Sequence, residues 1–126
     1  MEKTVYSEIT LDGFKKLQLS GHPNQVIILK FGAEWCKPCK LIKDYCYKNF
    51  SELPEHVICI DLDIDETIEI YGTFKSKKMI NGVPTLLAFF GNERRDFWYV
   101  PDCSVSGTDE NELNIFFKKI KNFALR

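Results

Sequence analysis

The chain alternates between short apolar runs and longer stretches in which apolar residues recur every three or four positions. The almost continuous apolar runs occupy residues 26–31 and 57–63, a pattern typical of strands buried on both faces. Between them, over residues 40–50, the apolar positions follow the spacing of a helix with one buried face. This alternation of strand and helix predicts a sheet packed between helices.

The same alternation continues toward both ends of the chain. A loose strand pattern over residues 4–9 and a helical spacing over residues 11–19 precede the first buried run. After residue 63 the pattern predicts a helix from about residue 66, a strand at 86–90, a hairpin turn, a strand at 96–100 and a final helix from residue 109. The predicted order is βαβαβαββα in a single domain, residues 1–126, because no repeat or linker interrupts it.

Composition and charge limit the class of protein. A length of 126 residues, 44% of them apolar, is enough for a core that needs no metal or disulfide framework. The net charge of −1 disfavours a nucleic acid or an anionic membrane as partner. No apolar run is long enough to span a bilayer, and the polar N-terminal residues do not resemble a signal peptide. Five cysteines, an odd number, suit a reducing compartment, so we expect a cytoplasmic protein.

Two cysteines lie where the strand at 26–31 gives way to the helical pattern. Cys36 falls in the first turn, where free backbone N–H groups and the helix dipole favour a thiolate. Cys39 follows one turn later on the same face, placed to attack a mixed disulfide formed at Cys36. A zinc site is the alternative, but the sequence offers no second pair of ligands at a suitable spacing, so no metal is expected.

Two segments carry a resemblance to a known family. Residues 31–40, Phe-Gly-Ala-Glu-Trp-Cys-Lys-Pro-Cys-Lys, resemble the active-site segment of thioredoxins. Residues 81–85, Asn-Gly-Val-Pro-Thr, resemble that family's second signature, which contains a cis proline. The resemblance implies the α/β thioredoxin fold, with a central mixed sheet of about five strands flanked by four helices, and Pro84 facing the cysteines across a groove.

The resemblance also implies roles for individual residues. Cys36 resembles the exposed nucleophile, Cys39 the buried resolving thiol and Trp35 the aromatic that flanks the site. Pro84 resembles the residue that leaves the backbone of Val83 free to pair with an extended substrate segment. The implied protein is a monomeric thiol-disulfide oxidoreductase that reduces protein disulfides without a metal or organic cofactor. A reductase or another dithiol regenerates it.

Two other functions remain open at this point. A thioredoxin fold also serves as a redox-independent binding or adaptor module, although such a module needs neither Cys36 and Cys39 nor Trp35 and Pro84. A disulfide oxidant or isomerase uses the same residues as a reductase, and only the redox potential separates these activities.

The chain departs from the family behind the dithiol. Thioredoxins usually carry an aspartate on the strand before the active site and a lysine on the neighbouring strand, whereas Lys30 and Asp61 stand here in the reverse arrangement. We expect the two to pair across adjacent strands, with Asp61, or water held by the pair, accepting the proton of the resolving thiol. Alternatively, Lys30 lies at the sheet edge and extends its ammonium into water.

Two further residues have alternative interpretations. Lys37 either favours the Cys36 thiolate, which makes the disulfide more oxidising, or points into water, where screening removes its effect. Cys103 follows the predicted last strand in a long loop, residues 101–107, which brings it toward Cys36 and Pro84. It is a third redox thiol, a regulatory thiol or an ordinary loop cysteine.

The remaining candidates are expected to have structural roles. Cys46 and Cys59 fall at buried positions and are interpreted as inert packing thiols. His22 and His56 lie beside loop prolines and are expected to be solvated.

Overall fold

The computed structural model describes residues 3–126, and its elements follow the predicted order βαβαβαββα. The strands are β1 (Val5–Tyr6), β2 (Val26–Gly32), β3 (Val57–Asp63), β4 (Thr85–Phe90) and β5 (Cys103–Ser106). The helices are α1 (Leu11–Leu17), α2 (Lys37–Ser51), α3 (Ile68–Ser76) and α4 (Glu110–Ala124). No helix among the described residues has the length and apolar character needed to cross a membrane.

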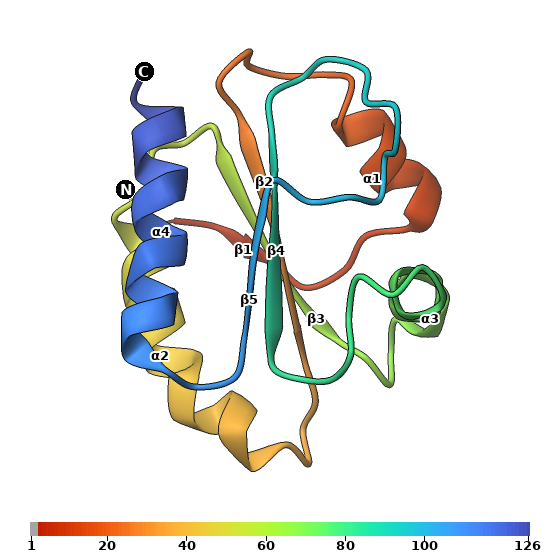
Figure 1. Ribbon diagram of the computed structural model, residues 1–126, viewed down its shortest axis with the longest axis vertical. Helices are drawn as coiled ribbons and strands as arrows, with labels where there is room; N and C mark the ends of the chain where they lie inside the picture. Colours follow the sequence, from red (N-terminus) through yellow and green to blue (C-terminus); the bar gives the residue numbers. More distant parts are fainter. Residues whose placement is uncertain (1–2) are drawn as a thin grey trace.

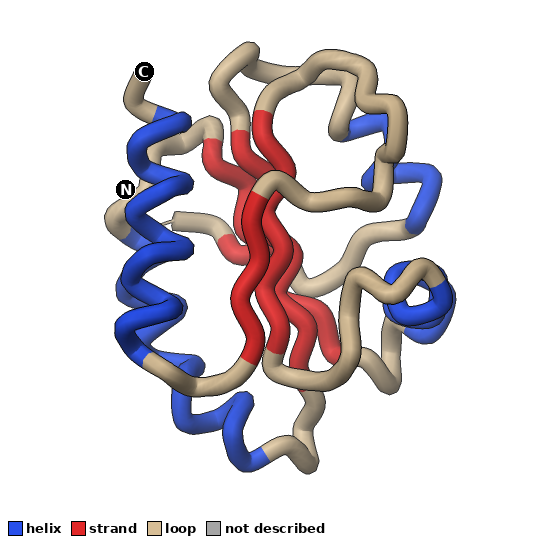
Figure 2. Tube along the Cα trace, viewed as in Figure 1, coloured by secondary structure: helices blue, strands red, loops and turns tan. Residues whose placement is uncertain are grey.

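The five strands form one mixed sheet in the order β1-β3-β2-β4-β5. The first three strands of the chain pair in parallel, whereas β4 runs antiparallel to both β2 and β5. Helices α2 and α4 cover one face of this sheet, and α1 and α3 cover the other (Figures 1 and 2). This arrangement is the predicted mixed sheet of five strands between four helices.

The central strand β2 separates the two layers of the core. Every residue of β2 is buried, which confirms the prediction of a strand covered on both faces. Val26 and Ile28 pack toward α2 and α4, whereas Ile27 and Leu29 pack toward α1 and α3. Because side chains alternate along a strand, Lys30 lies on the side of Val26 and Ile28 and faces α2.

The predicted strand at residues 96–100 is wrong. The strand that pairs with β4 is β5, and residues 91–102 form the irregular connection between them. The aromatic residues at 97–99 suggested a strand, but the Trp98 ring instead packs edge-on against Phe14 and Phe74, with centroids 6.3 Å and 5.8 Å away. Burying this ring over α1 and α3 takes the segment away from the sheet.

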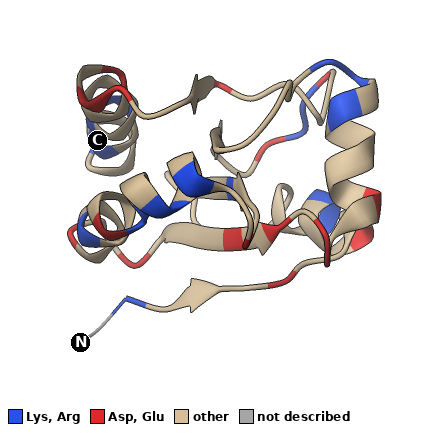
Figure 3. Cartoon of the chain, turned by 90° about the horizontal axis from the view of Figure 1, so that it is seen from below, with Lys and Arg blue, Asp and Glu red and all other residues tan. Residues whose placement is uncertain are grey.

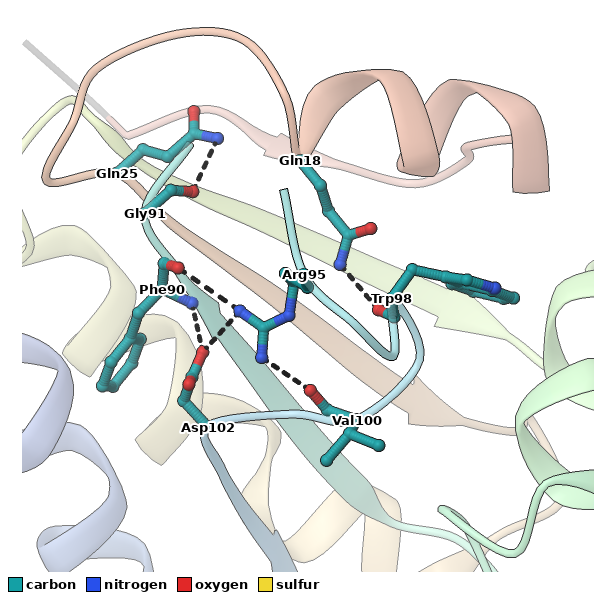
Figure 4. A network of polar contacts seen from close by, with 8 residues as sticks. All are labelled: Gln18, Gln25, Phe90, Gly91, Arg95, Trp98, Val100 and Asp102. Atoms are coloured by element: carbon teal, nitrogen blue, oxygen red, sulfur yellow. Dashed lines mark hydrogen bonds and ion pairs between the residues drawn. The ribbon is translucent and has the colours of Figure 1, made fainter. Parts of the chain in front are cut away.

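A network of polar contacts anchors the segment at residues 91–102 (Figure 4). Arg95 donates to the carboxylate of Asp102 at 2.9 Å and to the carbonyl oxygen of Val100 at 2.7 Å. The same carboxylate accepts the backbone N–H of Phe90 at 2.7 Å. The buried amide of Gln18 donates to the carbonyl oxygen of Trp98 at 2.8 Å, so the segment is tied to α1 as well as to the end of β4.

Candidate functional site

The two cysteines of the site lie at the start of α2. Cys36 is the N-cap residue, with extended backbone angles, and α2 begins one residue later. The backbone N–H of Cys39 donates to the Cys36 sulfur at 3.2 Å, in the way that an N-cap side chain satisfies a free N–H group. Pro38 fits in this first turn because the N–H that it lacks has no partner within the helix.

Cys36 and Cys39 form a disulfide, with their Cα atoms 5.3 Å apart. The Cys36 residue is 4% exposed and Cys39 is 5% exposed, and both pack with Ala33 and Val83. The expectation that Cys36 is exposed is therefore wrong for the disulfide form. The Cys36 sulfur is covered because it faces Cys39 on one side and Val83 on the other.

The segment before β4 approaches the disulfide from the opposite side. The carbonyl oxygen of Val83 lies 3.8 Å from the Cys36 sulfur, and the Val83–Pro84 peptide bond is cis. Thr85 anchors this segment, because its hydroxyl donates to the carbonyl oxygen of Gly82 at 2.6 Å. The backbone of Val83 therefore borders the dithiol directly.

Trp35 presents its side chain to solvent beside the disulfide. The residue is 67% exposed, and its indole N–H donates to the Asp65 carboxylate at 2.9 Å. Asp65 is held in turn, because its backbone N–H donates to the Asp63 side chain at 2.8 Å. Sequence reasoning missed Asp65 as a residue of the site, because its contact with Trp35 joins two segments far apart in the chain.

Lys30 and Asp61 form the predicted ion pair behind the disulfide. They are register partners on β2 and β3, and the Lys30 Nζ lies 3.2 Å from Asp61 Oδ1. The Lys30 side chain is 4% exposed and that of Asp61 is 20% exposed. The alternative that Lys30 reaches water from a sheet edge is wrong, because β2 has a neighbouring strand on each side.

Tyr47 on α2 contacts the same carboxylate. Its hydroxyl donates to Asp61 Oδ2 at 2.6 Å, so the two oxygens of Asp61 face two different donors. Burial, followed by the hydrogen bond to Asp61, raises the pKa of Tyr47 above its usual value. Sequence reasoning missed Tyr47, since no local pattern shows which side chain of α2 reaches β3.

A cavity of about 210 Å³ connects this pair with the dithiol, and Lys30, Asp61 and Cys39 all line it. Gly32 makes room for it: a Cβ atom added there meets the Cys39 sulfur at 3.5 Å and the Lys30 Nζ at 3.7 Å. The ammonium and the sulfur therefore border the same small space. The volume is sufficient for water molecules to enter.

The other three cysteines are unpaired. Burial raises the pKa of Cys46 to about 11 and that of Cys59 to about 12, so both thiols stay protonated at neutral pH. Cys103 lies opposite Ala88, whereas Ser106 lies opposite Thr85 next to the site. The expectation that Cys103 lies near the dithiol is therefore wrong, because β5 begins with Cys103 at the far end of its pairing with β4.

The charged residues near the site differ in their surroundings. Charged residues lie mainly on helices and loops (Figure 3), whereas Lys30 lies within β2 and Asp61 and Asp63 lie within β3. Lys37 is exposed at the start of α2, which agrees with the interpretation that it points into water. Across residues 3–126, no three His, Cys, Asp or Glu side chains gather as metal ligands would.

The two histidines lie together, away from the dithiol. Their rings stack with centroids 4.4 Å apart. His56 Nε2 donates to the carbonyl oxygen of Ala124 at 2.7 Å, and His22 Nδ1 accepts the backbone N–H of Asn24 at 2.9 Å. The expectation of solvated histidines is correct for His22, which is exposed, but not for His56, which is half-buried and hydrogen-bonded to the end of α4.

Comparisons with known proteins agree with this geometry. A family model described as thioredoxin matches residues 6–117. Thioredoxin 3 of Plasmodium falciparum is 30% identical over 119 residues, which cover 94% of this chain and 61% of that relative, so the chain spans less than two thirds of the relative's length.

Solved structures give the same picture. The crystal structure of Plasmodium falciparum thioredoxin has a TM-score of 0.67 at 27% identity, over 92% of this chain and 86% of that one. The crystal structure of thioredoxin from Trypanosoma brucei brucei has a TM-score of 0.72 at 21% identity, over 100% of this chain and 96% of that one. This second likeness concerns the fold alone.

Proposed function

The chain belongs to the thioredoxin family, and from this premise we propose that it is a thiol-disulfide oxidoreductase that reduces protein disulfides. The observation that carries the proposal is the Cys36–Cys39 disulfide at the start of α2, bordered by the backbone of Val83. Formation and cleavage of this one bond are sufficient for the reaction. No metal or organic cofactor is required for it.

In the first step, the reduced Cys36 thiolate attacks a sulfur of the substrate disulfide. The backbone N–H of Cys39 and the positive end of α2 stabilise the negative charge on the Cys36 sulfur. A mixed disulfide forms, the substrate S–S bond breaks, and the released substrate thiolate takes up a proton. The step needs no external oxidant or reductant, because one disulfide bond replaces another.

In the second step, Cys39 resolves the mixed disulfide. Its sulfur attacks Cys36, the Cys36–substrate bond breaks, and the second substrate thiolate leaves. The Cys39 thiol gives up its proton in this step. The proposed proton acceptor is Asp61, or water held by Asp61 and Lys30 in the shared cavity. This proposal is supported by the fact that Cys39, Asp61 and Lys30 all line that cavity.

Substrate binding is assigned to the residues that border the dithiol. The backbone of Val83, held by Pro84, pairs with an extended segment of the substrate next to the Cys36 sulfur. Trp35, 67% exposed and oriented by Asp65, offers an aromatic surface to the same segment.

The remaining features of the proposal concern electron supply, assembly and location. A reductase or another dithiol returns the disulfide to its reduced form, and the protein works as a monomeric single domain. The cytoplasm is the proposed location, a proposal supported by the free thiols of Cys46, Cys59 and Cys103.

A disulfide oxidant is the second candidate activity. The Lys30 ammonium and the Cys39 sulfur both lie next to Gly32, which has no side chain to separate them. A cation near a thiolate stabilises the reduced form of a dithiol. The first turn of α2 also lacks an acidic residue that would oppose this effect. A measured reduction potential well above that of a typical thioredoxin, about −270 mV, would favour the oxidant.

Reduction of insulin disulfides tests the proposal. We expect turnover with a dithiol donor, loss of turnover in Cys36→Ser, and accumulation of a mixed disulfide with insulin in Cys39→Ser. Cys103→Ser is the matched control, because this thiol lies away from the site and should leave turnover unchanged. Turnover that survives Cys36→Ser contradicts the mechanism, and absence of turnover in the wild type favours an adaptor.

A further inference from the structure

Tyr47 completes a chain of polar contacts that runs from α2 through β3 to β2. Its hydroxyl donates to Asp61 Oδ2 at 2.6 Å, while Lys30 contacts Asp61 Oδ1 at 3.2 Å. The chain ends at the cavity that Lys30 and Asp61 share with Cys39. Tyr47 itself does not line this cavity, so it reaches the dithiol only through Asp61.

The hydroxyl of Tyr47 restricts what the Asp61 carboxylate is able to do. The Asp61 side chain is 20% exposed, so without a second donor it is free to turn from Lys30 toward water. Tyr47 therefore fixes the direction of the carboxylate toward Lys30 and the shared cavity.

We propose that Tyr47 is a positioning residue for the resolving step, which holds Asp61 in its pair with Lys30 and keeps its carboxylate directed at the cavity where it accepts the Cys39 proton. The proposal rests on the proposed disulfide reduction, and it concerns only the second half of that reaction. Cys39 loses its proton to Asp61, its sulfur bonds to Cys36, and the substrate sulfur leaves with the electron pair of the broken bond. Asp61 then releases the proton to solvent.

Several charged or titratable groups surround Asp61 besides Tyr47. These groups lie on β2, β3 and α2 and in the turn between β2 and α2. Tyr47 differs from all of them, because it donates a hydrogen bond to Asp61 but does not line the cavity. They are Lys30 on β2, Cys39, Lys40, Lys43 and Cys46 on α2, Asp63 on β3 and Glu34 in the β2–α2 turn. The phenol remains a donor in this setting, because burial and Asp61 raise the pKa of Tyr47.

Tyr47→Phe is a suitable test, because it removes the hydroxyl and retains the ring that packs at 5.6 Å from Phe50. Tyr45→Phe is the matched control, since Tyr45 lies on the same helix and its hydroxyl bonds to Asn114 instead. Each pre-reduced protein is mixed with insulin and acid-quenched over time across acidic to neutral pH. Mass spectrometry of the Cys36–insulin adduct then separates its formation from its resolution.

In Tyr47→Phe we expect resolution of the adduct to slow about tenfold, the effect of losing one hydrogen bond to a charged group. Formation of the adduct should keep its wild-type rate, and Tyr45→Phe should change neither step. Asp61→Asn should slow resolution at least as much, and adding Tyr47→Phe to it should slow resolution no further. Thermal unfolding of each variant checks that the fold is retained.

The possible contrary results are distinct. If the wild type forms and resolves the adduct but Tyr47→Phe resolves it at the wild-type rate, Tyr47 has only a packing role. Equal slowing of both steps, or the same slowing in Tyr45→Phe, also overturns the proposal, because the effect is then not specific to Asp61. If the wild type forms no adduct at all, the proposed disulfide reduction fails, and the role of Tyr47 fails with it.

Discussion

The buried Lys30–Asp61 pair should respond unequally to loss of its two members. Asp61→Asn leaves the Lys30 ammonium, whose side chain is 4% exposed, without an opposite charge. Removal of one partner from a buried pair typically costs about 3–5 kcal/mol of folding free energy. We expect about 3 kcal/mol, the lower end of this range, because Asn keeps an acceptor for Lys30 and the Asp61 side chain is 20% exposed.

Lys30→Met should have a much smaller effect on stability. It removes the buried cation, fills the space with apolar atoms and leaves Asp61 in contact with Tyr47 and with water. Because the remaining carboxylate keeps a donor and contact with water, it is not left as an uncompensated buried charge, so we expect a change of about 1 kcal/mol or less. The asymmetry follows from the fivefold difference in exposure between the two side chains, 4% and 20%.

Urea unfolding of the oxidised proteins measures both changes. With a typical slope of about 1–3 kcal/mol per molar urea, Asp61→Asn should lower the midpoint by about 1–3 M. Lys121→Met is the control, because its pair with Glu52 is exposed, at 37% and 49% of the side chains, and exposed pairs contribute about 0–1 kcal/mol. Equal losses in Asp61→Asn and Lys30→Met would refute the reasoning, as would a larger loss in Lys30→Met.

Three further predictions concern the rest of the molecule. Arg95→Met should lower the free energy of unfolding by about 2 kcal/mol, through loss of charge-assisted hydrogen bonds that hold residues 91–102. It should also speed proteolysis there, whereas Arg94→Met, at an exposed position, should do neither. Cys103→Ser should keep the wild-type reduction potential in a glutathione titration, and a shift would make this thiol a redox participant. The free energy of unfolding should fall as the pH rises above 9, because the pKa of Cys46 is 9.0 in the unfolded chain and about 11 in the folded chain. Cys46→Ala should reduce the dependence of the unfolding free energy on pH, and an unchanged dependence would contradict this.

The amino-acid sequence by itself determined the order of the elements and the position of the dithiol. Alternation of buried runs and helical spacing is a local property, so it predicted β2, α2 and β3 and put Cys36 at the start of a helix. The pairing of Lys30 with Asp61 was also predictable, because the resemblance to thioredoxins implies that the two residues lie on neighbouring strands, and they are register partners there.

Tertiary structure alone decided the features that depend on contacts between distant segments. The aromatic residues at 97–99 are compatible with a strand and also with a loop that packs over the core. Only the contacts of Trp98 with Phe14 and Phe74 show that this segment packs over α1 and α3. The pairing of β5 with β4 places Cys103 opposite Ala88 and therefore away from the site. Tyr47 reaches Asp61 through the packing of α2 on the sheet, a geometry that no periodic pattern encodes, because periodicity identifies a buried face but not the residue it meets.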